Sequence, residues 1–158
     1  MTNIFYYDTK IGRIKIEENG TAITKIQFIG KDIEEELVKK NETELLKETM
    51  KQLGEYFEGK RDFFDLPLEP KGTEFQKKVW NALIEIPYGQ TKSYGEVAKV
   101  IGNEKASRAV GMANNKNPIP IIIPCHRVIG ANGKLVGYAG GLDLKQKLLQ
   151  LEKEKQHT

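Results

Sequence analysis

Cysteine and histidine are scarce in this sequence of 158 residues, which has one cysteine, Cys125, and two histidines, His126 and His157. One cysteine cannot form an internal disulfide, which favours a reducing compartment, so we expect a cytoplasmic protein. Three such side chains are too few for a structural zinc site, and the sequence contains no phosphate-binding loop or other cofactor motif. We therefore expect no metal and no cofactor, and the chemistry has to come from the side chains themselves.

Long hydrophobic runs are missing as well. The longest strongly apolar segment, Ile119–Pro124, contains prolines and is far shorter than the roughly 20 residues that cross a bilayer. The first residues lack the basic stretch and the apolar core of a signal peptide. We expect no association with membranes, because 39% hydrophobic and 30% charged residues without repeats are typical of a globular protein.

Charge is divided unevenly along the chain, although the net charge is only +3. Residues 1–70 contain 11 Lys and Arg against 15 Asp and Glu, a net charge of −4. Residues 71–158 contain 14 against 7, a net charge of +7. A basic half joined to an acidic half favours a polyanionic partner such as nucleic acid, although surface lysines alone do not establish one.

Residues 1–70 are predicted to form an N-terminal α/β domain. A helix is expected to begin at Asn41 and to end at Gly59, because apolar residues between them recur at helical spacing. The proline-containing segment 62–70 is expected to supply a last strand and a linker. The first part of the domain is expected to be a sheet of strands 4–7, 13–18 and 22–28, with Asn19-Gly20 as a hairpin turn.

Residues 71–158 are predicted to form a mostly helical second domain. Thr73 with Gln76, and Ser93 with Glu96, have the spacing of capping boxes and mark two helix starts. The second of these helices is expected to be short and to be followed, after a Gly-Asn turn, by a helix at about 104–114. Two short helices around a tight turn predict a helix-turn-helix.

The remaining segments of this half complete a winged arrangement. The glycine-rich stretch 130–141 is expected to be a tight loop or wing. A final helix capped by Asp143 is expected to bury Leu144, Leu148, Leu149 and Leu151. The fold class that follows is α+β.

Cys125 is the best candidate for a nucleophile, because it lies directly before His126 and Arg127. Two neighbouring cations can hold a thiol as the attacking thiolate, and His126 is the one plausible proton acceptor. An isolated buried cysteine is more often a small hydrophobic residue. A papain- or caspase-type protease is disfavoured, because the signatures of those families are absent.

The segment Pro124-Cys125-His126-Arg127-Val128 resembles the signature of the O6-alkylguanine-DNA alkyltransferases, also called methylated-DNA–protein-cysteine methyltransferases. The resemblance covers residues 73–152 without a gap, whereas residues 1–70 match in outline only, as a ribonuclease H-like α/β domain. The motifs that carry it are Pro87-Tyr88-Gly89, Ser93-Tyr94, Ser107–Gly111, Asn117-Pro118, Ile119–Ile123 and Gly137–Leu142.

The resemblance implies a catalytic role for four residues. Cys125 would accept the alkyl group from O6 of guanine, and from O4 of thymine, in an irreversible single-turnover displacement. His126, acting through a water, and Glu152 would complete the relay that forms the thiolate. Tyr94 would donate a hydrogen bond or a proton to the guanine ring, so that guanine leaves as a neutral base.

The resemblance also implies a set of DNA-binding and supporting residues. Arg108 would fill the gap left by the flipped-out nucleotide, and Ser107, Ala109 and Gly111 would give its helix a small surface that approaches a groove closely. Many relatives have serine where this chain has Ala139, so one hydrogen bond to O6 would be missing. The remaining residues are Tyr138, which lies with Ala139 in the loop over the extruded base, and the structural supports Asn117 and Arg127.

Two alternatives belong to other classes. An alkyltransferase-like protein binds the lesion without reacting, but such proteins replace the nucleophile, which is intact here as Cys125. A winged-helix transcriptional regulator would need a polar recognition helix, and the small residues around Arg108 argue against it. The expected partner is double-stranded DNA that contains O6-alkylguanine, bound by a monomer.

Overall fold

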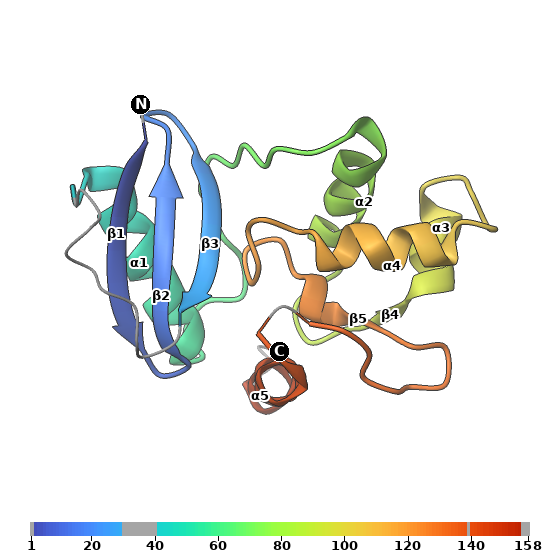
Figure 1. The fold of residues 1–158 in the computed structure, drawn as a ribbon. Helices are drawn as coiled ribbons and strands as arrows, with labels where there is room; N and C mark the ends of the chain where they lie inside the picture. The colour runs from blue at the N-terminus through green and yellow to red at the C-terminus, as the bar shows by residue number, and fades with distance from the viewer. Residues whose placement is uncertain (1, 30–40, 139, 156–158) are drawn as a thin grey trace. The chain divides into compact units, whose positions relative to one another are not determined.

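The computed structural model describes residues 2–29, 41–138 and 140–155. The chain forms two compact units, Met1–Pro70 and Lys71–Thr158, which are described separately here (Figure 1). The first unit is a small antiparallel sheet with one helix, and the second is mostly helical. The predicted α+β class is therefore confirmed. Two residues named above, Ala139 and His157, lie outside the described residues.

The N-terminal unit is a three-stranded antiparallel sheet with one helix packed across it. The strands are β1 (Asn3–Thr9), β2 (Gly12–Glu18) and β3 (Ile23–Ile29), paired in the order β1-β2-β3. Helix α1 (Glu44–Phe57) contacts β1 and β2 (Figure 1). Alternate residues of β2, namely Ile14, Ile16 and Glu18, are buried, as expected for a strand with one buried face. The core of this unit includes Ile14, Ile16, Ile23, Leu46, Leu53 and Tyr56.

Two predictions in this unit are wrong in detail. Helix α1 is capped by Thr43 and not by Asn41, because the Asn41 side chain donates a hydrogen bond to Asn3 of the sheet. The segment 62–70 forms no strand but a single bridge between Leu68 and Ile23. Prolines at both sides of Leu68 lack the N–H that a longer ladder requires.

The described residues of the C-terminal unit form four α-helices, one short 3-10 helix and a short strand pair. Helices α2 (Glu74–Ile84), α3 (Tyr94–Val100) and α4 (Ser107–Asn115) contact one another (Figure 1). Both predicted capping boxes are confirmed, at the starts of α2 and α3. Strand β4 (Lys92–Ser93) pairs in parallel with β5 (Val128–Ile129), and helix α5 (Leu142–Glu154) ends the described chain. None of the described helices has the length and the apolar character that a membrane span requires.

Helix α5 departs from its prediction at its start and along one edge. Gly141, with a φ of 91°, is its N-cap, and Asp143 lies in the first turn without a capping hydrogen bond. A carboxylate there still interacts favourably with the N-terminal end of the helix dipole. Leu144 and Leu148 are buried as predicted, whereas Leu149 and Leu151 are only partly buried. The buried face is completed instead by two charged residues, Lys145 and Glu152.

Trp80 joins α2 to α4 in the centre of the C-terminal unit. Its side chain is 1% exposed, and its indole Nε1 donates a 2.8 Å hydrogen bond to the carbonyl of Ala113. The ring also packs over Gly72, where an added Cβ would lie 2.4 Å from a ring carbon. The indole therefore fixes α2 against the helix that precedes the cysteine loop.

Replacing Trp80 by Phe should destabilise the C-terminal unit, because it removes the buried indole hydrogen bond to the Ala113 carbonyl, which then keeps only the N–H of Lys116, and because it removes packed atoms. We expect the free energy of unfolding to fall by about 2–3 kcal/mol, measured by urea denaturation with far-UV circular dichroism. Asn81→Ala, at an exposed position of the same helix, is the matched control. Equal stabilities of the two variants would contradict this role.

Candidate active site

Cys125 lies at the start of the short 3-10 helix η2 (Cys125–Arg127), and its side chain is almost completely buried. The preceding loop is held by Asn117, whose Nδ2 donates to the carbonyl of Ile123 at 2.8 Å and whose Oδ1 accepts from the N–H of Ile119 at 3.0 Å. A further bond runs from the Asn114 Nδ2 to the carbonyl of Cys125, at 3.3 Å. The sulfur is therefore positioned by side chains that bind the backbone around it.

The same loop contains a strained residue. Ile121 has a φ of 74°, although its branched Cβ makes the left-handed region unfavourable. Such a conformation costs on the order of 1–3 kcal/mol and persists only where the surroundings enforce it. Ile121 is fully buried, and the Ile123 N–H closes the turn onto the Ile119 carbonyl at 2.9 Å. Packing and turn geometry together hold the cysteine loop in this shape.

The carboxylate of Glu152 is the centre of the site. It accepts Nε of Arg127 at 2.8 Å and Nη2 of Arg127 at 3.1 Å, and its Oε2 lies 2.5 Å from Nε2 of His126. The N–H of Gly89 donates to the same carboxylate at 3.1 Å. A buried charge needs such pairing to offset its desolvation. Glu152 therefore connects α5 to η2 and to the turn that follows α2.

Arg127 extends this network to the Pro87-Tyr88-Gly89 turn. Its Nη1 donates to the carbonyl of Ile86 at 2.8 Å, and its guanidinium lies 5.7 Å from the centre of the Tyr88 ring. Both contacts are made by a side chain that is only 6% exposed. The turn is thus tied directly to the residue two positions after the cysteine.

Protonation in this network follows from burial and pairing. Burial alone would raise the pKa of the Glu152 carboxyl, but the hydrogen bonds of His126 and Arg127 and the charge of Arg127 lower it below its usual value. Burial lowers the pKa of His126, against the opposing effect of Glu152. At neutral pH the imidazole is therefore neutral and the carboxylate charged. With Nε2 donating to Glu152, Nδ1 carries the lone pair that can accept a proton.

The Cys125 sulfur is a thiol in this structure. Burial raises its pKa to about 11, although the Asn117 side chain and the charge of Lys145 act in the opposite direction. From the sequence we expected His126 to help hold a thiolate, with Glu152 completing the relay. His126 does lie against Glu152, with its Nε2 2.5 Å from Oε2, but the imidazole is neutral and the sulfur keeps its proton. Ionisation of the sulfur therefore requires a proton transfer.

Lys145 was missed by the sequence analysis. Its side chain is completely buried in α5, and its Nζ donates to the carbonyls of Val128 at 2.6 Å, Val136 at 2.9 Å and Gly137 at 3.4 Å. Burial lowers the pKa of Lys145, and the Cys125 sulfur acts in the opposite direction. The available signal was its position two helical turns before Glu152, which places both residues on one face.

Two tyrosines approach the sulfur from other elements. The Tyr94 hydroxyl, at the start of α3, donates to the carbonyl of Val136 at 2.9 Å. Burial raises its pKa, and so does the nearby Cys125. Burial likewise raises the pKa of Tyr138 far above its usual value, with further contributions from Cys125 and Glu152. Both tyrosines named by the sequence therefore lie close enough to the sulfur to interact with it electrostatically.

The helix-turn-helix residues do not join this buried cluster. Arg108 and Ala109 are exposed on α4, and Ser107 and Gly111 are partly exposed. Their helix nevertheless contacts the site on its other side, because Asn114 binds the Cys125 carbonyl. An added Cβ at Gly111 would lie 3.8 Å from the Tyr94 ring. Helix α4 thus has an inner face toward the cysteine and an outer face that carries the arginine.

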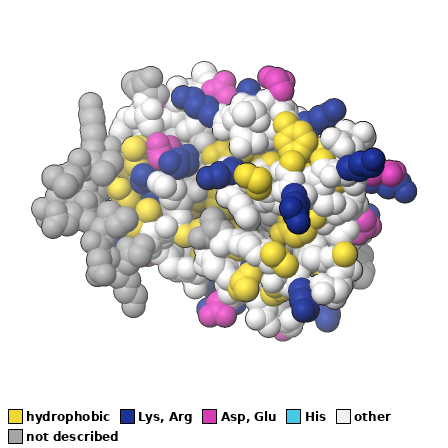
Figure 2. Space-filling view, turned by 45° about the vertical axis from the view of Figure 1, so that its right-hand side comes forward, with side chains coloured by type: hydrophobic (Ala, Val, Ile, Leu, Met, Phe, Trp, Pro, Cys, Tyr) yellow, Lys and Arg dark blue, Asp and Glu magenta, His cyan; other side chains and the backbone are white. Residues whose placement is uncertain are grey.

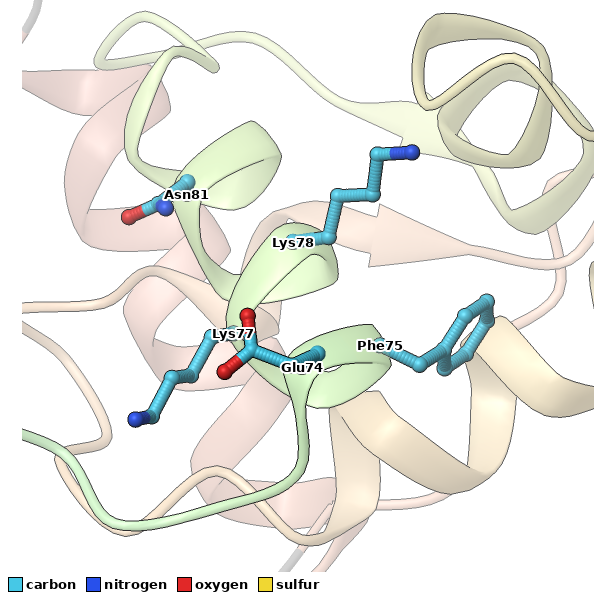
Figure 3. Close-up of a pocket in the computed structure, with 5 residues that line it drawn as sticks. All are labelled: Glu74, Phe75, Lys77, Lys78 and Asn81. Atoms are coloured by element: carbon cyan, nitrogen blue, oxygen red, sulfur yellow. The ribbon is translucent and has the colours of Figure 1, made fainter.

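The surface of the described residues carries basic groups (Figure 2) and an open pocket away from Cys125. Lysine and arginine side chains lie among hydrophobic ones on the face shown in Figure 2. An open pocket of about 540 Å³ lies along α2, where Figure 3 shows Phe75 pointing away from Glu74 and Lys77. Lys78 and Asn81 complete its lining, and none of these residues belongs to the cluster around Cys125. Within the described ranges, no three His, Cys, Asp or Glu residues are grouped so as to hold a metal ion.

Family models match nearly the whole chain. Residues 5–70 match the ribonuclease-like domain of 6-O-methylguanine DNA methyltransferase, and residues 74–154 match its DNA binding domain.

Individual relatives agree with these models. A methylated-DNA–protein-cysteine methyltransferase of Methanosarcina acetivorans is 68% identical over 109 residues, which cover 69% of this chain and 70% of the relative. One of Methanosarcina barkeri is 51% identical over 152 residues, covering 93% and 96%. The crystal structure of Mycobacterium tuberculosis OGT in complex with DNA has a TM-score of 0.86 at 43% identity, covering 98% of this chain and 93% of that one. The chain therefore belongs to the 6-O-methylguanine DNA methyltransferase family.

Proposed function

We propose that this protein repairs alkylated DNA by moving an alkyl group from O6 of guanine, and from O4 of thymine, onto the Cys125 sulfur. The observation that carries the proposal is the buried arrangement of Cys125, His126 and Glu152 inside a domain of the family's DNA-binding type. A neutral imidazole held by a carboxylate is a suitable acceptor for the thiol proton. Because the thioether that forms has no route back to a thiol, each molecule acts once.

The first step is proton transfer from the thiol. In this proposal the Nδ1 of His126 accepts the proton through a water, and Glu152 stabilises the imidazolium that results. Lys145 and Asn117 stabilise the negative charge on sulfur, in keeping with the direction in which both act on the Cys125 pKa. Fixed charges in a buried site stabilise developing charge more strongly than they do in water.

The second step is displacement at carbon. The thiolate attacks the alkyl carbon, a C–S bond forms, and the bond between carbon and O6 breaks with its electron pair on the guanine. Tyr94 donates its proton to the ring, and the imidazolium of His126 then returns a proton to Tyr94. The Tyr94 hydroxyl turns away from Val136 to do this, and the Val136 carbonyl keeps its hydrogen bond from Lys145.

A base inside a duplex cannot reach a sulfur that is 4% exposed, so the nucleotide has to be flipped out. We assign to Arg108 the filling of the gap, and to Ser107, Ala109 and Gly111 the close approach of α4 to the groove. We also assign Tyr138 and Ala139 to covering the extruded base, and Asn117 and Arg127 to supporting the cysteine loop. The charge of +7 in residues 71–158 supplies affinity for phosphates, which makes binding sensitive to salt.

The proposal extends to the setting of the reaction. One thiol and one helix-turn-helix per chain are enough for one lesion, so we propose that a monomer acts on double-stranded DNA without contact with membranes. A free, functional thiol is maintained most easily in the reducing cytoplasm, which is the location proposed here.

Incubation with a duplex containing O6-methylguanine should add one methyl group to each protein chain, because Cys125 reacts once. Intact-mass spectrometry and peptide mapping should locate it on Cys125, and Cys125→Ser should gain nothing. A wild-type chain that binds the lesion but stays unmodified would support the non-catalytic alkyltransferase-like alternative instead.

Arg108→Ala should impair repair of duplex DNA more than reaction with free O6-benzylguanine, because only the duplex has a stack to hold open. We expect the rate of methyl transfer from duplex to fall at least about tenfold, with the free-base rate nearly unchanged. Lys153→Ala, at an exposed position of α5, controls for the loss of one positive charge. Equal losses on both substrates would contradict the role of Arg108.

Lys145→Met should slow alkylation of Cys125 by iodoacetamide, because the charge of Lys145 lowers the thiol pKa and its removal raises it. The wild-type rate should keep increasing with pH up to about 11, where the thiol ionises. At pH 8–9 we expect the variant to react about tenfold more slowly, which corresponds to one pKa unit. Lys147→Met, exposed on the same helix, is the control. A rate that is equal in both variants would exclude the electrostatic effect.

A further inference from the structure

The outer face of α4 has a crest formed by three residues. Val110, Ala113 and Asn114 are buried, so the centre of the opposite face falls at Arg108, Met112 and Asn115 at 100° per residue. The smaller residues Ala109 and Gly111 lie at the sides of this crest. Met112 is 68% exposed, one turn beyond Arg108.

Met112 is the one large apolar side chain on this crest, and it projects because the residues beside it are small. An isolated exposed hydrophobic residue needs no explanation in general. Here, however, the flanking Ala109 and Gly111 leave the methionine standing above the helix surface. Its position next to the arginine places it on the face that the proposed function directs toward DNA.

The chemistry of this face suits a minor groove. The Asn115 side chain lies beside Gly137 of the glycine-rich loop, and the flanks of the crest are Ala109 and Gly111. This face therefore lacks the row of polar side chains with which a major-groove recognition helix reads base edges. Proteins that open the minor groove insert apolar side chains such as methionine between or against base steps, and combine them with arginine. The net charge of +7 in residues 71–158 provides the phosphate attraction that such an approach needs.

We propose that Met112 is a second wedge, which enters the minor groove beside Arg108 and loosens the neighbouring base step. This inference rests on the proposed function. Four helical residues advance about 6 Å, and one base-pair step about 3.4 Å, so a helix lying along the groove places Met112 less than two steps from the gap. Arg108 occupies the vacated stack, and Met112 packs against the adjacent sugars and base edges. Met112 thereby lowers the cost of extruding the nucleotide without touching it.

The test compares duplex and free substrates for Met112→Ala and Met112→Leu. Burial of a methionine side chain corresponds to a factor of about ten or more, so Met112→Ala should lower transfer from duplex O6-methylguanine about tenfold. Transfer from free O6-benzylguanine should stay within twofold of wild type, roughly the scatter of such measurements. Met112→Leu keeps the apolar bulk and should retain most of the duplex rate. Alanine is a strong helix former, so the variant folds.

A second measurement reports the stack directly. In a Cys125→Ser background, 2-aminopurine placed at the base pairs that flank the lesion should fluoresce more strongly when the protein binds. Met112→Ala should abolish this increase at one flank only. Phe63→Ala, a similarly exposed apolar position in the N-terminal unit, is the control and should change neither readout.

Three results would overturn the proposal. They are a duplex rate for Met112→Ala within twofold of wild type, an equal loss on both substrates, or an unchanged 2-aminopurine signal. A variant that alters self-association in sedimentation, but not duplex repair, would assign the crest to a second copy of the chain. If the wild-type protein transferred no alkyl group at all, the proposed function itself would fail, which these variants do not test.

Discussion

The C-terminal unit depends on the hydrogen bonds and ion pairs that the buried carboxylate of Glu152 makes. It gathers Arg127 and His126 from the cysteine turn and Gly89 from the turn after α2. Removing one partner from such a network leaves an uncompensated charge, which is costly in a buried site. The residue that we propose orients the proton acceptor thus also holds three chain segments together. A substitution of Glu152 would therefore affect the stability of the C-terminal unit and the proposed proton transfer together.

The imidazole of His126 is neutral and the thiol of Cys125 is protonated, so the site is not ionised for attack before a substrate binds. Burial keeps the sulfur uncharged, with a pKa of about 11, while Asn117 and Lys145 offer the stabilisation that a thiolate would need. The barrier to ionisation is therefore set by desolvation, and the means of overcoming it are already in place. Such a thiol is sheltered from small oxidants and electrophiles, because these attack the thiolate. We therefore expect the Cys125 thiol to react mainly with a substrate that fits the site.

The sequence predicted features that depend on local signals or on a family pattern. The capping boxes at Thr73 and Ser93 were predicted correctly because each is complete within four residues. The helix start at Thr43 was not predicted correctly, because the Asn41 side chain binds Asn3 in a strand far away in the sequence and does not cap the helix. Lys145 was not predicted, because its burial depends on hydrogen bonds to three carbonyls that only the fold brings together. The resting protonation of Cys125 was not predicted, since it depends on how completely the fold buries the sulfur.

One helix carries both the proposed stack-filling arginine and a hydrogen bond to the backbone of the nucleophile, through Asn114. The separation between these two points is therefore set by the length of a few helical turns, and it does not vary with the sequence of the DNA. If Arg108 fills the stack as proposed, a nucleotide extruded beside it would reach the sulfur, whereas a nucleotide extruded elsewhere would not. Because the helix fixes this distance, we expect the DNA, and not α4, to change its conformation when the two bind.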